Sequence, residues 1–167
     1  MSERWSREDE SVLRRWQDAH ELFVREALCV EKPSTQQRDA SAKLSALVRG
    51  KRKRAGLLRG SLTDEEVEHS SKRGISIMSG QGTGKDAWTS WALLWFLFCF
   101  PRPLIPCTAP GKKQLRDALW KECAKWLRHS RETHTARGST FNLENYITWQ
   151  AERIFMCDVE GTPGAEW

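Results

Sequence analysis

The sequence predicts an α/β fold, in which an incomplete parallel sheet is flanked by helices and preceded by an N-terminal helical arm. Two observations lead to this prediction. A short β-prone segment, 74–79, runs directly into a glycine-rich stretch, and a strongly apolar helical pattern follows it. A second candidate strand, 104–109, is followed by a second helical pattern, which is the element order typical of parallel strands. We expect a helical arm with a basic loop over 1–60 and a partial P-loop NTPase-like core over 61–167.

Length and composition favour a globular protein of about one domain. The chain has 167 residues, of which 39% are hydrophobic and 29% charged, so general disorder is excluded. The net charge of +5 is consistent with a polyanionic partner but does not demonstrate one. Five cysteines without a C-x-x-C pair indicate a reducing compartment, and the longest apolar run, 91–100, is too short to span a bilayer. We therefore expect a soluble, cytoplasmic protein with no membrane partner.

The predicted arm consists of two helices and a loop. Apolar residues recur at helical spacing over 11–30, and Pro33 ends this pattern. Ser34 and Gln37 then have the spacing of a capping box that opens a second helix. The basic run 49–54 is interpreted as an exposed loop, either a solvated linker or a contact to DNA phosphates. Thr63 begins a short acidic helix.

The predicted core contains one unusually apolar helix. Trp88, Trp91 and Trp95 recur at three- and four-residue spacing, which favours core packing over base stacking, and we expect this helix to lie against a sheet. Prolines 101 and 103 end it. A helical stripe then includes Leu115, Leu119, Cys123, Trp126 and Leu127, and two further strands are expected over 146–149 and 153–157.

The most specific motif is the glycine-rich stretch Gly80-Gln81-Gly82-Thr83-Gly84-Lys85-Asp86. It resembles the phosphate-binding P-loop, in which a glycine and four free positions precede Gly-Lys-Ser/Thr. Glycines allow successive backbone N–H groups to face an anion, and the following helix directs its positive end to the same point. A lysine adds a full charge at the outer phosphates. We therefore expect a nucleotide-phosphate site here.

Asp86 departs from the motif because it occupies the usual hydroxyl position. A carboxylate can bind Mg²⁺, although it brings negative charge toward the phosphates. Alternatively, Asp86 is simply an acidic residue that favours the first helical turn. Both interpretations stay open at this stage.

Three stretches of the chain together resemble the large terminase subunit of tailed bacteriophages, the ATPase motor that packages viral DNA. They are 75–86 with its tryptophan-rich helix, Cys107-Thr-Ala-Pro110, and 114–122. Upstream, 21–26 and 35–39 are also similar to the N-terminal region of that family. The resemblance covers the chain from about Trp16 to Leu127.

The resemblance implies a set of site residues, cofactors and partners. ATP phosphates would be bound by the glycine-rich stretch from Gly80 to Lys85, with Mg²⁺ near Asp86. Gln37 would contact adenine, with Gln36 as the second choice, although a capping-box role is the simpler explanation of Gln37. The implied partners are double-stranded DNA, the small terminase subunit and the portal, in the cytoplasm of a bacterial host.

The chain also departs from that family. The family's Walker B strand consists of four apolar residues followed by Asp-Glu, and this chain has no such segment. The apolar residues 154–157 are followed by Asp158, but Val159 stands where the motif requires glutamate. Glu160 comes one residue late and so faces the other side of a strand. The carboxylate-rich nuclease domain is missing as well, so we interpret the chain as a truncated N-terminal part that is an ATPase only if further sequence completes it. A helicase-like ATPase and a non-catalytic DNA-binding or assembly module are the alternatives.

Overall fold

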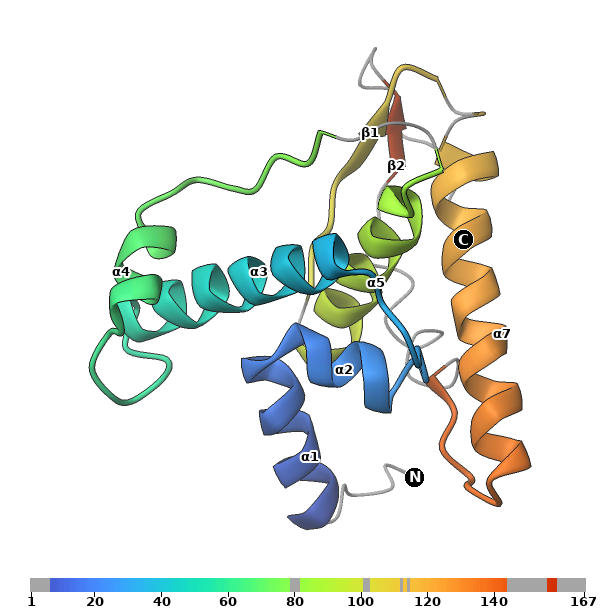
Figure 1. Cartoon of the computed structure of the whole chain (residues 1–167), viewed down its shortest axis with the longest axis horizontal. Coiled ribbons are helices and arrows are strands. Elements are labelled where there is room, and N and C mark those ends of the chain that lie inside the picture. Colours follow the sequence, from blue (N-terminus) through green and yellow to red (C-terminus); the bar gives the residue numbers. More distant parts are fainter. Residues whose placement is uncertain are drawn as a thin grey trace.

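The computed structural model describes residues 7–78, 82–100, 103–111, 113, 115–143 and 156–158, and these residues form a predominantly helical body (Figure 1). Its elements are α1 (Arg7–Asp18), α2 (His20–Glu26), α3 (Thr35–Arg54), α4 (Asp64–Ser70), α5 (Lys85–Cys99), β1 (Cys107–Ala109), a π-helix (Leu115–Trp120), α7 (Lys121–Ala136) and β2 (Met156–Asp158). Among the described residues, no helix is long and apolar enough to cross a membrane.

Local signals set the boundaries of several helices. Ser34 and Gln37 form the predicted capping box at the start of α3, and Thr63 and Glu66 form another at the start of α4. The single helix expected over 11–30 is divided into α1 and α2, because Ala19 has an extended backbone. The Ser45 hydroxyl of α3 accepts a hydrogen bond from the His20 N–H at the first residue of α2.

Helix α5 is the centre of the core. Nine of its fifteen residues are buried, as its apolar pattern predicts, and they include Trp88, Trp91 and Trp95. The indole N–H of Trp95 donates to the Trp16 carbonyl of α1 at 2.6 Å, and Trp91 packs edge-on against Trp126 of α7. Helices therefore cover α5, and the core draws side chains from both halves of the chain.

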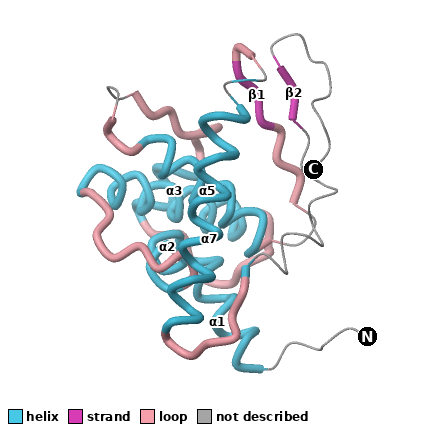
Figure 2. Tube along the Cα trace, turned by 90° about the vertical axis from the view of Figure 1, so that its right-hand side faces the viewer, coloured by secondary structure: helices cyan, strands magenta, loops and turns pink. Residues whose placement is uncertain are grey.

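The predicted parallel sheet flanked by helices is wrong. The described strands are a single parallel pair of three residues each, in which Cys107 pairs with Met156 and Ala109 with Asp158 (Figure 2). Residues 74–78 are not a strand but an exposed loop, in which Met78 is 93% exposed. The prediction failed because helices bury α5, so the apolar helix needs no sheet to cover it. The strand expected over 146–149 lies outside the described residues.

The basic run 49–54 is not a loop either, because it forms the C-terminal end of α3. Several of its cations bind neighbouring groups: Arg49 and Lys53 bind Glu66, Arg52 binds Asp18, and Arg54 donates to Ser70. Lysine and arginine at a helix C-terminus also complement the helix dipole. The run therefore joins α3 to α1 and α4, and this use accounts for it without a nucleic acid.

Candidate phosphate-binding site

The N-terminus of α5 and the glycines before it form the candidate site. Gly82 and Gly84 have φ angles of +74° and +79°, a left-handed conformation that side chains with a Cβ rarely adopt. Lys85 is the first residue of α5, and the Trp88 N–H donates to the Gly84 carbonyl at 3.0 Å, which closes the first helical turn. The glycines thus turn the chain directly into a 15-residue helix.

This helix end is suited to an anion. The first backbone N–H groups of a helix have no partner within the helix and carry its positive partial charge. The residue at the N-cap is Gly84, which has no side chain with which to cap them. Lys85 adds a cation at the same end, whereas the carboxylate of Asp86 in the first turn is exposed and opposes it. The arrangement can bind phosphate oxygens through backbone and lysine donors.

Gln37 of α3 contacts this helix end directly. Its amide oxygen accepts from the Ser34 N–H at 2.8 Å, which completes the capping box of α3. Its amide nitrogen donates to the Gly84 carbonyl at 3.0 Å. A Cβ at Gly84 would lie 2.6 Å from that nitrogen, so the contact requires glycine there. One side chain therefore both caps α3 and holds the N-cap of α5.

A second link between α3 and α5 lies behind the first. The indole N–H of Trp88 donates to the Ser41 hydroxyl at 3.0 Å, and this hydroxyl donates to the Gln37 carbonyl at 2.8 Å. Trp88 is buried, so its N–H needs a protein partner. No local pattern in the sequence marks Ser41, because 47 residues separate it from Trp88.

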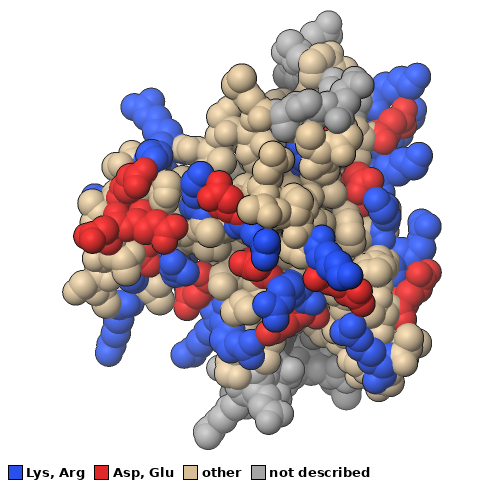
Figure 3. Space-filling view, viewed as in Figure 1, with Lys and Arg blue, Asp and Glu red and all other residues tan. Residues whose placement is uncertain are grey.

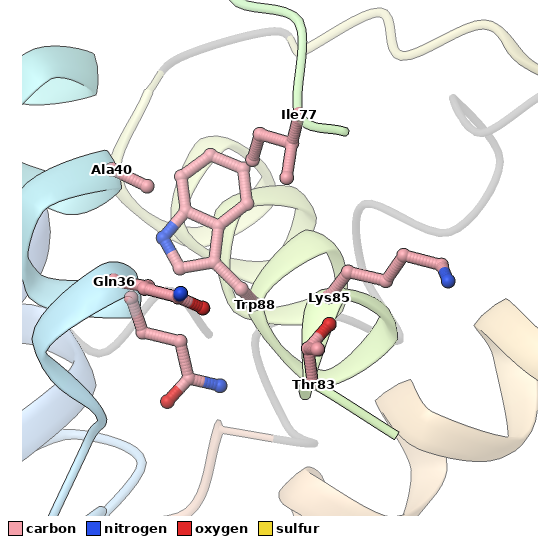
Figure 4. A pocket seen from close by; sticks show the side chains of 7 residues that line it. Gln36, Ala40, Ile77, Thr83, Lys85 and Trp88 are labelled. Carbon is pink, nitrogen blue, oxygen red and sulfur yellow. The ribbon is translucent and has the colours of Figure 1, made fainter. Parts of the chain in front are cut away.

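A small cavity of about 40 Å³ lies between α3, the glycine loop and α5. Its lining residues are Gln36, Gln37, Ala40, Ile77, Thr83, Lys85 and Trp88. Figure 4 shows the Trp88 indole beneath Ile77, with the Lys85 side chain extending away from it. A space of this size holds only a few water molecules, and it opens toward solvent. A ligand at this helix end would therefore lie mainly outside the cavity.

The structure brings most of the sequence-predicted site residues together. Gly82, Thr83, Gly84, Lys85 and Asp86 are consecutive at the N-terminus of α5, and Gln37 adjoins them. The remaining predicted residues, Gly80 and Gln81, lie outside the described residues. Across the described ranges, no group of three or more His, Cys, Asp or Glu side chains is placed to hold a metal, so Asp86 belongs to no such cluster.

A larger hollow of about 480 Å³ lies elsewhere, between the segment after α2 and helix α7. Its lining residues are Cys29, Val30, Glu31, Lys125, Trp126, Arg128, His129 and Glu132. Carboxylates and cations share its walls, so its charges do not favour an anionic ligand in the way that the start of α5 does. The glycine loop is the better candidate for a phosphate.

No protein-family profile matches the chain, and neither a curated protein nor a solved structure matches it.

Proposed function

We propose that the chain binds the phosphate tail of ATP at the N-terminus of α5, as the nucleotide-binding part of a phage DNA-packaging motor of terminase type. The observation that carries the phosphate site is the pair of left-handed glycines that lead into α5, with Lys85 at its first position. The proposal rests on this loop and helix end and not on a P-loop sheet. Mg²⁺ would accompany the nucleotide, and Asp86 is the one carboxylate that the motif offers it.

The motor role and its partners rest on the sequence resemblance alone. Double-stranded DNA, the small terminase subunit and the portal are the partners that it implies. The basic run 49–54 gives little support to a DNA contact, because its cations already bind groups of α1 and α4. On the face shown in Figure 3, acidic and basic side chains are interspersed and form no uniformly basic stripe. Nucleotide binding is therefore the part of the proposal to test first.

Calorimetric titration of ATP into the wild type and Lys85→Ala provides the test. A charge-assisted hydrogen bond contributes about 1.5–3 kcal/mol, so Lys85→Ala should weaken ATP binding about tenfold or more. Lys121→Ala is the matched control, because Lys121 is also the first residue of a helix but follows a π-helix and not a glycine turn. Equal ATP affinity in the wild type and Lys85→Ala would refute the phosphate site.

The alternatives predict different results in the same samples. A non-catalytic DNA-binding module predicts salt-dependent binding to double-stranded DNA that neither ATP nor Lys85→Ala changes. A helicase-like ATPase predicts the same loss of ATP affinity as the motor but binding to single-stranded DNA. Both DNA substrates should therefore be titrated with and without ATP.

A further inference from the structure

The Gln37 side-chain amide connects α3 to the first peptide unit of α5. This unit joins Gly84 to Lys85, and its carbonyl accepts from both Trp88 N–H and Gln37 Nε2, each at 3.0 Å. A trans peptide is planar, so its C=O and its N–H point in opposite directions. Fixing the Gly84 carbonyl toward α3 and the helix interior therefore fixes the Lys85 N–H outward, at the end of the helix.

Both polar atoms of the Gln37 amide are already used in hydrogen bonds, so few are available to bind a base. Its oxygen accepts from the Ser34 N–H and its nitrogen donates to Gly84, so each polar atom already has a partner. The cavity beside it is small, at about 40 Å³. Contact between Gln37 and adenine would break the cap of α3 or the bond to Gly84.

We infer that Gln37 is a positioning residue, which orients the Gly84–Lys85 peptide for phosphate, and that the site recognises the polyphosphate tail and not the base. This inference rests on the proposed phosphate site. Its consequence is that ATP, GTP and inorganic tripolyphosphate bind with similar affinity, and that a change at Gln37 weakens all three by the same factor. A residue that reads adenine would affect ATP alone.

The variant Gln37→Glu separates the two contacts of this side chain. Glutamate at this position still accepts from the Ser34 N–H, as in a standard capping box, but its ionised carboxylate cannot donate to the Gly84 carbonyl. Gln36→Glu is the matched control, because it brings the same charge to the lining of the same cavity and leaves the Gly84 bond intact. The difference between the variants thus reports the contact of residue 37 with the Gly84 carbonyl, and the charge that both variants carry cancels to first order.

Calorimetric titration of ATP, GTP and tripolyphosphate into the full chain tests the inference. A typical hydrogen bond corresponds to an affinity change of about threefold to tenfold, so Gln37→Glu should bind each ligand that much more weakly than Gln36→Glu. Equal affinities in the two variants, or a loss confined to ATP, would overturn the inference while the Lys85→Ala result still supported the phosphate site. Failure of the wild type to bind any of the three ligands would overturn the proposed function as well.

A measurement without ligand tests the same link. In ¹H–¹⁵N spectra of the unliganded chain, the Lys85 amide resonance should shift in Gln37→Glu and stay in place in Gln36→Glu. Only the first variant removes one of the two hydrogen bonds to the carbonyl of the Gly84–Lys85 peptide. Far-ultraviolet circular dichroism shows that both variants keep the helical content of the wild type. A Lys85 resonance that moves equally in both variants contradicts the positioning role.

Discussion

Replacing Glu66 with glutamine is the sharpest test of how the basic end of α3 is held. Glu66 is 2% exposed, and its carboxylate accepts hydrogen bonds from Arg49 Nε at 2.9 Å, Lys53 Nζ at 2.7 Å and the Thr63 N–H at 3.0 Å. Glutamine keeps the shape of the side chain but has one acceptor oxygen and one donor group. Either Arg49 or Lys53 must then face the amide N–H₂ group, which is a donor and cannot accept its hydrogen bond.

The expected loss follows from the burial of the pair. Removing one partner of a fully buried ion pair destabilises a protein by about 3–5 kcal/mol. Here the side chains of Lys53 and Arg49 are 14% and 30% exposed, so water can solvate them partly once Glu66 is gone. We therefore expect Glu66→Gln to lower the free energy of unfolding by about 2–4 kcal/mol, which corresponds to a decrease in Tm of about 4–16 °C.

Urea unfolding at pH 7, followed by tryptophan fluorescence, measures this loss. Glu65→Gln is the matched control, because Glu65 is exposed in the same first turn of α4 and the substitution removes the same charge. It should change the stability by no more than about 0.5 kcal/mol. Equal losses in the two variants would refute the argument that the buried contacts of Glu66 hold α3 to α4.

The pH dependence of the Glu66→Gln deficit provides a second check. Burial alone raises the pKa of Glu66, but hydrogen bonds from Lys53, Thr63 and Arg49 outweigh it and lower this pKa from 4.5 to about 2. Because the pKa is lower in the folded state, the stabilisation is complete above pH 4.5 and is lost as the pH falls toward 2. The deficit should therefore be constant from pH 7 to 5 and shrink below pH 4.5.

Four further substitutions test other parts of the structure. Gly50→Ala would place a Cβ 2.6 Å from the Cβ of Ser70 in α4. Urea unfolding should therefore show a loss of about 1–3 kcal/mol, although alanine has the higher helix propensity. A gain in stability would contradict this close approach. Burial lowers the pKa of His20 from 6.5 to about 4, because its charged form would lose its solvation there. The unfolded chain then binds more protons than the folded one, so the wild type should lose stability as the pH falls from 6.5 to 4. His20→Phe should remove that slope, of about 3 kcal/mol in total, and an unchanged slope would assign it to other groups. Gly84→Ala should destabilise the chain more than Gly82→Ala in urea unfolding. Both glycines have positive φ, but only at Gly84 would the added Cβ meet the Gln37 side chain. Equal losses in the two variants would show that Gln37 moves aside without a cost in stability.

Part of the candidate site could be predicted from the sequence alone. The motif placed Gly82, Gly84 and Lys85 at a turn into a helix, and the structure has this turn with the two left-handed glycines. Gln37 was predicted either to cap α3 or to contact adenine, and the structure confirms the cap. Its bond to Gly84 could not be predicted, because it joins residues 47 positions apart that no local pattern connects.

The sequence by itself determined the local features of this protein: two capping boxes, the apolar helix α5 and the glycines at its start. These depend on contacts within about four residues and on helical periodicity, which a sequence displays directly. The tertiary structure alone decided that helices and not a sheet bury α5, and that 49–54 ends a helix whose cations bind α1 and α4. The physical reason is that an apolar or charged face specifies that it needs a partner, while the identity of that partner depends on how distant segments pack together.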